Sequence, residues 1–163
     1  MGAFEDELLA VLPRLRRFAR ALANSAADAD DLAQATVEKA LKARQQWQPG
    51  TRMDSWMYRI MRNAWIDTAR ARRRAAETFA PEEAGENVAD GGAAGIEAHI
   101  EFREVQTAIT QLPDEQREAV ALVLIEGLAY KEAAEILDVP MGTLTSRLVR
   151  GRQALVARLG EAA

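Results

Sequence analysis

Two helical patterns separated by a proline-containing interruption occupy residues 127–159, and this arrangement constrains the fold more than any other stretch. Residues 130–137 have apolar side chains at helical spacing, with acidic side chains between them. The sequence Asp138-Val139-Pro140 then interrupts the pattern, because proline lacks an amide hydrogen and disfavours a helical conformation in the preceding residue. A second helix is therefore expected to begin near Pro140 or Met141, and the pair predicts a helix-turn-helix.

The second of these helices has one apolar face and one polar face. At about 100° per residue its leucines form a single stripe, and they are Leu144, Leu148, Leu155 and Leu159. Thr143, Ser146 and Arg150 fall on the opposite side, flanked by Arg147, and no carboxylate occurs between residues 141 and 160. An amphipathic helix whose arginines are merely solvated is the ordinary alternative. The short first helix, the turn and the carboxylate-free face favour a helix that reads the major groove of DNA.

The N-terminal part contains two further helical patterns. Apolar residues recur at three- and four-residue steps from Phe4 to Leu22, and Pro13 is expected to kink or divide this helix. A second helix is expected over about residues 28–44, and the acids within its first turns, at positions 28, 30 and 31, suit the positive end of a helix dipole. Because no further ligands converge on these acids, helix capping is favoured over metal binding.

A third N-terminal helix, over residues 53–74, interleaves aromatic and basic side chains. It contains two of the three tryptophans and ends in three consecutive arginines. This composition suits stacking and charge pairing with unstacked nucleic acid. Tryptophan and methionine at helical spacing, however, more often form a core. We therefore leave Trp56 and Asn63 as the open positions and assign to the core Met57, Ile60, Met61 and Ala64.

Charge is segregated along the chain, although the net charge is only −4. Residues 1–74 have a net charge of +5, from 14 basic and 9 acidic side chains, whereas residues 75–101 have 7 acidic side chains and no basic ones. Residues 75–95 lack periodicity and are rich in small residues, as in a flexible linker. Residues 96–163 rebuild about four helices, and no strand pattern appears. The sequence predicts an all-α protein of two small domains, whose halves need not share a core.

The composition excludes several functional classes. There is no cysteine, which removes disulfides, thiolate metal sites and cysteine nucleophiles, and the single histidine, His99, lacks partners at metal-ligand spacing. No set of nucleophile, base and orienting group is recognisable, so catalysis, a metal site and a cofactor are not expected. No apolar run approaches the ~18 residues that span a bilayer, and we expect a soluble, intracellular protein without membrane insertion.

Three segments resemble the extracytoplasmic-function (ECF) group of bacterial sigma factors, the dissociable specificity subunits of RNA polymerase. Residues 27–41, ADADDLAQATVEKAL, are similar to the family's polymerase-docking helix. Residues 55–74, SWMYRIMRNAWIDTARARRR, are similar to its promoter-melting helix, and residues 112–152 to its reader of the upstream promoter element. The resemblance implies a sigma-two domain over residues 1–74, a flexible acidic linker over 75–95, and a sigma-four domain with the helix-turn-helix over 96–163.

The resemblance also implies site residues, position by position. Contacts to core polymerase fall on Asp30, Asp31, Leu32 and Gln34. Contacts to the melted promoter element fall on Trp56, Tyr58, Arg59, Asn63, Arg70 and Arg73. Contacts to the upstream promoter element fall on Tyr130, Lys131, Thr143, Thr145, Ser146, Arg147 and Arg150. Thr145 and Val149 depart from the family's common pattern, which leaves the identity of the upstream sequence open.

The implied function is promoter-specific initiation of transcription in the bacterial cytoplasm. The implied partners are core RNA polymerase, promoter DNA in duplex and melted form, and an anti-sigma factor. Two other functions remain as alternatives. A stand-alone helix-turn-helix regulator would leave the tryptophan-containing helix unexplained. A sigma-like decoy that titrates an anti-sigma protein is disfavoured because Ser146, Arg147 and Arg150 are all in place.

Overall fold

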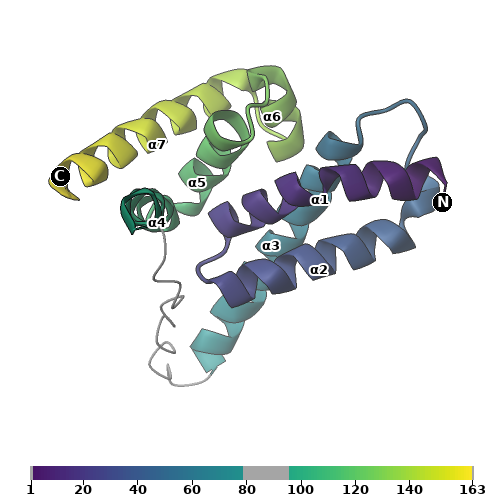
Figure 1. The fold of residues 1–163 in the computed structure, drawn as a ribbon, viewed down its shortest axis with the longest axis horizontal. Helices are drawn as coiled ribbons and strands as arrows, with labels where there is room; N and C mark the ends of the chain where they lie inside the picture. The colour runs from purple at the N-terminus through teal and green to yellow at the C-terminus, as the bar shows by residue number, and fades with distance from the viewer. Residues whose placement is uncertain (1, 79–95, 163) are drawn as a thin grey trace.

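The computed structural model describes residues 2–78 and 96–162, and every regular element in these ranges is a helix (Figure 1). The first range contains α1 (Ala3–Leu22), α2 (Ala26–Lys42), the single 3-10 turn η1 (Arg44–Gln46) and α3 (Met53–Thr78). The second contains α4 (Ile96–Thr110), α5 (Asp114–Val120), the π-helical turn η2 (Ala121–Ile125), α6 (Tyr130–Leu137) and α7 (Met141–Ala162). The predicted all-α fold is confirmed. The predicted linker lies largely outside the described residues.

Helix α1 runs without interruption past Pro13, so of the two outcomes expected, a kink or a division, the division is wrong. The amide that proline lacks would have bonded to the carbonyl of Leu9, one turn earlier. Both residues are exposed, Leu9 at 49%. Water can therefore bond to the free carbonyl of Leu9. Burial of the apolar face of α1 compensates for the remaining cost of a proline inside the helix.

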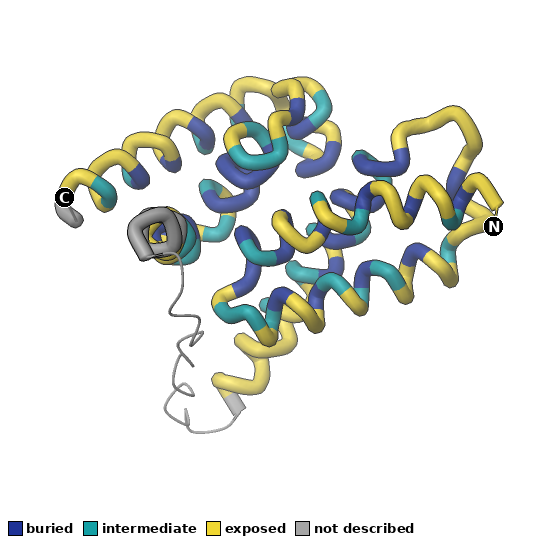
Figure 2. Tube along the Cα trace, viewed as in Figure 1, coloured by how far each residue is buried: buried dark blue, intermediate teal, exposed yellow. Residues whose placement is uncertain are grey.

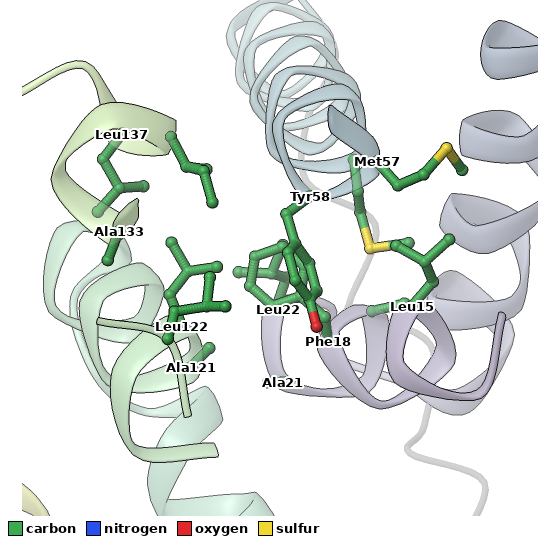
Figure 3. Packing of buried hydrophobic residues seen from close by; sticks show 14 of the residues in the cluster. Leu15, Phe18, Ala21, Leu22, Met57, Tyr58, Ala121, Leu122, Ala133 and Leu137 are labelled. Carbon is green, nitrogen blue, oxygen red and sulfur yellow. The ribbon is translucent and has the colours of Figure 1, made fainter. Parts of the chain in front are cut away.

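The two halves share one hydrophobic core, which the acidic segment between them did not lead us to expect (Figure 2). Helix α1 packs against α2 and α3 and also against α4, α5 and η2, while α3 contacts α6. Leu122 of η2 faces Leu22 and Tyr58 across this junction (Figure 3). Phe18 and Tyr58 are fully buried, and their rings meet edge to face at 5.2 Å. The halves pack together because the C-terminal end of α1 is apolar on more than one side.

Arg117 of α5 extends the junction. Its guanidinium group is buried there, and only 6% of the whole residue is exposed. It donates to the carbonyl oxygen of Leu22 at 2.8 Å, at the end of α1, and to the side-chain oxygen of Asn24 at 3.2 Å. It also donates to the carbonyl of Thr110, the last residue of α4, and to that of Leu112, just beyond it. Helix ends leave such carbonyls without intrahelical partners. One side chain therefore satisfies the C-terminal ends of two helices from different halves.

Gly151→Ala is predicted to destabilise the protein, because α7 packs against α5 at this glycine. A Cβ atom at residue 151 would lie 2.8 Å from Cγ2 of Val120 and 3.3 Å from Cβ of Gln116, closer than van der Waals contact allows. Overpacking of this kind costs about 1–3 kcal/mol, which lowers the midpoint of thermal or urea unfolding. Gly142→Ala is the matched control on α7, since nothing lies within 4 Å of its added Cβ. Equal midpoints for the two variants would contradict the close packing.

Candidate nucleic-acid interface

The helix-turn-helix forms where the sequence predicted it. Helix α6 ends at Leu137, and Asp138 follows in the left-handed region with φ 54° and ψ 50°. This conformation reverses the chain direction, and aspartate adopts it more readily than most residues with a side chain. The carbonyl of Pro140 then accepts the first bond of α7 from the amide of Leu144 at 3.1 Å. The proline thus precedes α7, where its missing amide hydrogen costs no hydrogen bond.

The outer face of α7 presents three polar side chains at steps of three and four residues. Ser146 and Arg150 are exposed and Thr143 is partly exposed, while Leu144 and Leu148 behind them are buried. Three- and four-residue steps place such side chains on one side of a helix. This side is free of packing in the described residues, and it has the hydroxyl and guanidinium groups that bind base edges and phosphates.

The four other predicted upstream-element residues differ in how available they are. Tyr130, 44% exposed, and Lys131 lie at the start of α6 and face solvent. The hydroxyl of Thr145 donates back to the carbonyl of Met141 at 2.9 Å, so its proton is used within the helix. The side chain of Arg147 is 22% exposed and lies 3.7 Å from Glu115 of α5. It therefore lies at the edge of the polar face formed by Thr143, Ser146 and Arg150, a position better suited to a phosphate than to a base edge.

Helix α3 presents four of the six residues predicted for the melted promoter element on one side. Steps of three, four and seven residues separate Trp56, Arg59, Asn63 and Arg70, which together form what we term the α3 stripe. Trp56 is partly exposed and the other three are exposed. The rings of Trp56 and Phe4 of α1 meet edge to face, with ring centroids 6.0 Å apart. An aromatic ring held in place beside basic and amide groups can stack on an unstacked base.

The remaining two residues predicted for the melted element are turned toward the C-terminal half. Tyr58 is fully buried, and its hydroxyl donates to Oε1 of Glu126 at 2.7 Å. Burial and the bond to Glu126 raise the pKa of Tyr58 well above its ordinary value, so the phenol stays neutral. Arg73 is paired with Asp114 of α5 at 3.1 Å. In this arrangement, therefore, neither side chain belongs to the α3 stripe.

A buried carboxylate fixes the start of α3. Asp54 accepts hydrogen bonds from the Ser55 amide at 2.8 Å, from Arg14 at 3.1 Å and from Nη2 of Arg52 at 2.7 Å. Arg52 also pairs with Glu132 of α6. Burial raises the pKa of Asp54, but the hydrogen bonds from Arg52 and the Ser55 amide outweigh it and hold the pKa below its ordinary value. The ionised carboxylate thereby orients the first turn of α3, from which Trp56 projects.

The residues predicted to dock on polymerase lie near the start of α2. Ser25 caps this helix, accepting from the Asp28 amide at 3.1 Å. Asp28 itself pairs with Arg72 of α3 at 2.7 Å, so the capping role expected of the acids rests with serine. Three of the four predicted docking residues have exposed side chains that a partner could contact, namely Asp30, Asp31 and Gln34. Leu32 differs from them, because it is only 6% exposed and belongs to the core-facing stripe with Ala29, Thr36 and Ala40.

Charged residues that close the junction between the halves were missed by sequence reasoning. Glu118, 4% exposed, accepts from Nε of Arg62 at 3.2 Å, and burial raises its pKa despite that arginine. Glu126 accepts from Arg17, which is 109 residues away in the sequence. Local periodicity cannot pair residues so far apart. The one sequence feature that could have indicated buried charges is the pair Arg117-Glu118, which lies in a short helix directly before an apolar run.

Two negative findings apply to the described parts of the chain. Within residues 2–78 and 96–162, no group of three histidine, aspartate or glutamate side chains is placed to hold a metal ion. None of the helices in those ranges combines the length and apolar composition that crossing a membrane requires. His99 lies outside the residues whose side chains are described.

The fold and the two exposed faces define a class of all-helical nucleic-acid-binding proteins with a helix-turn-helix in the C-terminal half and a basic, aromatic helix in the N-terminal half. Residues 8–62 match the family model described as "Sigma2 domain of PhyR", and residues 102–155 match that of "Sigma-70, region 4". The ECF RNA polymerase sigma factor EcfG of Rhodopseudomonas palustris is 38% identical over 96% of this chain and 85% of its own length. SigM of Mycobacterium tuberculosis is 37% identical over 90% and 72%. The chain belongs to the ECF RNA polymerase sigma factors.

Solved structures show the same architecture. The sigma factor RpoE of Bartonella quintana, in a co-crystal with the anti-sigma factor NepR, is 31% identical, with a TM-score of 0.79 over 98% of both chains. CnrH, in complex with the cytosolic domain of CnrY, is 25% identical, with a TM-score of 0.72 over 99% of this chain and 90% of its own. The likeness therefore extends across both halves of the molecule and is not confined to either.

Asp54→Asn is predicted to destabilise the protein at neutral pH by about 1–3 kcal/mol, because a neutral amide bonds the two arginines less well. A lowered pKa in the folded state means that the carboxylate's contribution is present above its unfolded pKa and is lost as the pH falls through the folded one. The unfolding free energies of the variant and the wild type should therefore converge in acid. Urea unfolding across a pH series measures this. Asp30→Asn, at an exposed position, is the control, and a difference that persists unchanged in acid would contradict the assignment.

Proposed function

We propose that this sigma factor brings core RNA polymerase to promoters by reading an upstream duplex element with α6 and α7 and by holding unstacked promoter bases on the α3 stripe. The observation that carries the proposal is the presence of two separate polar faces, one on each half, that suit two different forms of DNA. The α7 face offers hydroxyl and guanidinium groups of the kind that enter a major groove. The α3 stripe combines a fixed aromatic ring with basic and amide groups, as single-strand binding requires.

The two halves also divide the remaining roles. Residues 1–74 act as the polymerase-docking and melted-element domain, with Asp30, Asp31 and Gln34 as the contact set on α2. Residues 96–163 act as the upstream-element domain. The polymerase performs the chemistry, so the chain itself is not an enzyme. It works in the bacterial cytoplasm, and an anti-sigma factor is a further partner, as for the similar sigma factor RpoE, whose structure is a complex with one.

Arg150→Ala is predicted to weaken binding to a cognate upstream element by about 1–3 kcal/mol, the scale of one specific base contact. Arg150 is exposed on the polar face of α7 that it forms with Thr143 and Ser146. Arg152→Ala is the matched control, because it removes the same charge from a different side of α7. Fluorescence anisotropy with duplex DNA at fixed salt measures both. Equal losses for the two variants would mean that Arg150 contributes only general attraction to phosphates.

Asn63→Ala is predicted to reduce run-off transcription from a duplex promoter several-fold, since one hydrogen bond is worth about 1 kcal/mol. The loss should be smaller on a template whose melted segment is already mismatched, because part of the melting cost is then removed. Asn63 is exposed and its loss should not affect folding. Equal losses on both templates would contradict a role in melting.

Run-off transcription and binding assays with the wild-type protein separate the alternative functions. Transcription that requires core polymerase supports the sigma function. Duplex binding without any effect on core polymerase would instead indicate a stand-alone regulator. Binding to an anti-sigma protein without either activity would indicate a decoy.

A further inference from the structure

A cavity of 410 Å³ lies between α2, α3 and α5. One aromatic ring, that of Trp65, lines it together with the guanidinium groups of Arg72, Arg73 and Arg117. Ligand sites are concave and combine apolar surface with a few polar groups, and their volumes are roughly 300–1,000 Å³. The cavity is near the lower end of this range. It therefore has room for a molecule of about the size of one nucleotide or smaller.

Arg117 is a buried cation whose hydrogen-bond acceptors are all neutral. Its Nη1 and Nη2 atoms donate to the carbonyls of Leu22, Thr110 and Leu112 and to the amide oxygen of Asn24. Its Nε atom is also buried and has no acceptor among the described residues. Burial lowers the pKa of Arg117, because the charged form is costly where water is excluded. Buried charges in proteins are normally paired with an opposite charge.

The other charged groups of the cavity largely cancel one another. Both carboxylate oxygens of Asp28 accept from Arg72, at 2.7 and 3.1 Å. Asp114 accepts from Arg73 at 3.1 Å, so its favourable effect on the buried guanidinium is shared. Asp31 is exposed, and water weakens the field of its charge. The buried guanidinium therefore remains the least compensated charge of the cavity.

Trp65 gives the cavity a flat apolar surface. Its indole is partly exposed and packs against the core, and the guanidinium carbon of Arg117 lies over the ring, 6.0 Å from its centroid. Aromatic rings stack favourably on one another, and their faces attract cations. Ala35 and Ala69, which also line the cavity, have short side chains that leave space beside the indole. The cavity thus offers a stacking surface and a positive charge side by side.

We propose that this cavity binds a small aromatic anion, whose ring packs against Trp65 and whose phosphate or carboxylate group supplies the counter-charge of Arg117. Arg72 assists, because a guanidinium has more N–H groups than its pair with one carboxylate uses. The site goes beyond the proposed function, since no residue of the α3 stripe or of the polar face of α7 lines it. Asp31 and Leu32 of the predicted docking set do line it, so the ligand would lie beside the proposed polymerase contact.

The test uses the full-length protein and two probes, AMP for a phosphate group and benzoate for a carboxylate. At least one probe is expected to bind as one molecule per chain in isothermal titration calorimetry and to raise the midpoint of thermal unfolding. Adenosine and inorganic phosphate are the two halves of AMP, and benzyl alcohol and acetate correspond to those of benzoate. Each should bind roughly tenfold more weakly than its parent. No binding of either probe at millimolar concentration, or a half that binds as tightly as its parent, would overturn the proposal.

Two variants locate the site by calorimetry. Ala69→Leu fills the cavity without altering a charge, and Arg72→Gln removes one donor whose side chain is 58% exposed, so the fold should tolerate both. Each is expected to weaken binding roughly tenfold or more. Arg16→Gln is the matched control, because it removes the same charge from an exposed position that does not line the cavity. Equal affinities for the wild type and all three variants would exclude this cavity as the site. Arg117 is kept, because it also satisfies the ends of two helices.

Tryptophan fluorescence separates this site from the α3 stripe, whose Trp56 can also stack on a nucleotide ring. A probe bound in the cavity is expected to quench the emission of Trp65. The quenching should be lost in Trp65→Phe and persist in Trp56→Phe. The opposite pattern would place the probe on the α3 stripe and overturn the proposal. These measurements use neither DNA nor polymerase, so a failure of the proposed function would leave their outcome unchanged.

Discussion

The burial of the C-terminal end of α1 on several sides is the packing constraint on which both halves of the molecule depend. Phe18, Ala19, Ala21 and Leu22 are each at most 4% exposed. A helix on the surface of a domain buries a single stripe, whereas a helix that is apolar around its circumference must be surrounded. Helices α2 and α3 cover one part of this surface, and α4, α5 and η2 cover another. The C-terminal half is therefore held by the same helix that organises the N-terminal core.

Polar contacts determine how the halves are oriented on that apolar surface. Apolar packing is non-directional, so it would allow several docking angles of similar free energy. The guanidinium of Arg117 and the carboxylate of Glu126 must instead find specific acceptors and donors, since an unpaired buried charge costs several kcal/mol. Buried pairs of this kind add little net stability compared with apolar side chains of the same size. Their effect is to favour one arrangement over its near neighbours.

Local periodicity determined most of the secondary structure and the composition of each exposed face. The three- and four-residue steps of α7 and α3 place polar groups opposite buried ones whatever the surroundings. Proline, glycine and serine set the helix ends, as at Ser25 and Pro140, because their effects involve only neighbouring residues. The four-residue α3 stripe could therefore be predicted from the sequence. Tyr58 could not be separated from it, because its neighbour Glu126 is 68 residues away.

The sequence by itself thus determined an all-α chain of this family, with a helix-turn-helix and a basic aromatic helix as its two candidate DNA-binding faces. These properties follow from interactions within about one or two helical turns. Only the tertiary structure decided that the halves share a core, that Leu32 and Tyr58 face inward, and that Arg117 and Glu126 close the junction. Those outcomes depend on contacts between residues distant in the sequence, where neither periodicity nor charge pattern specifies which partners meet.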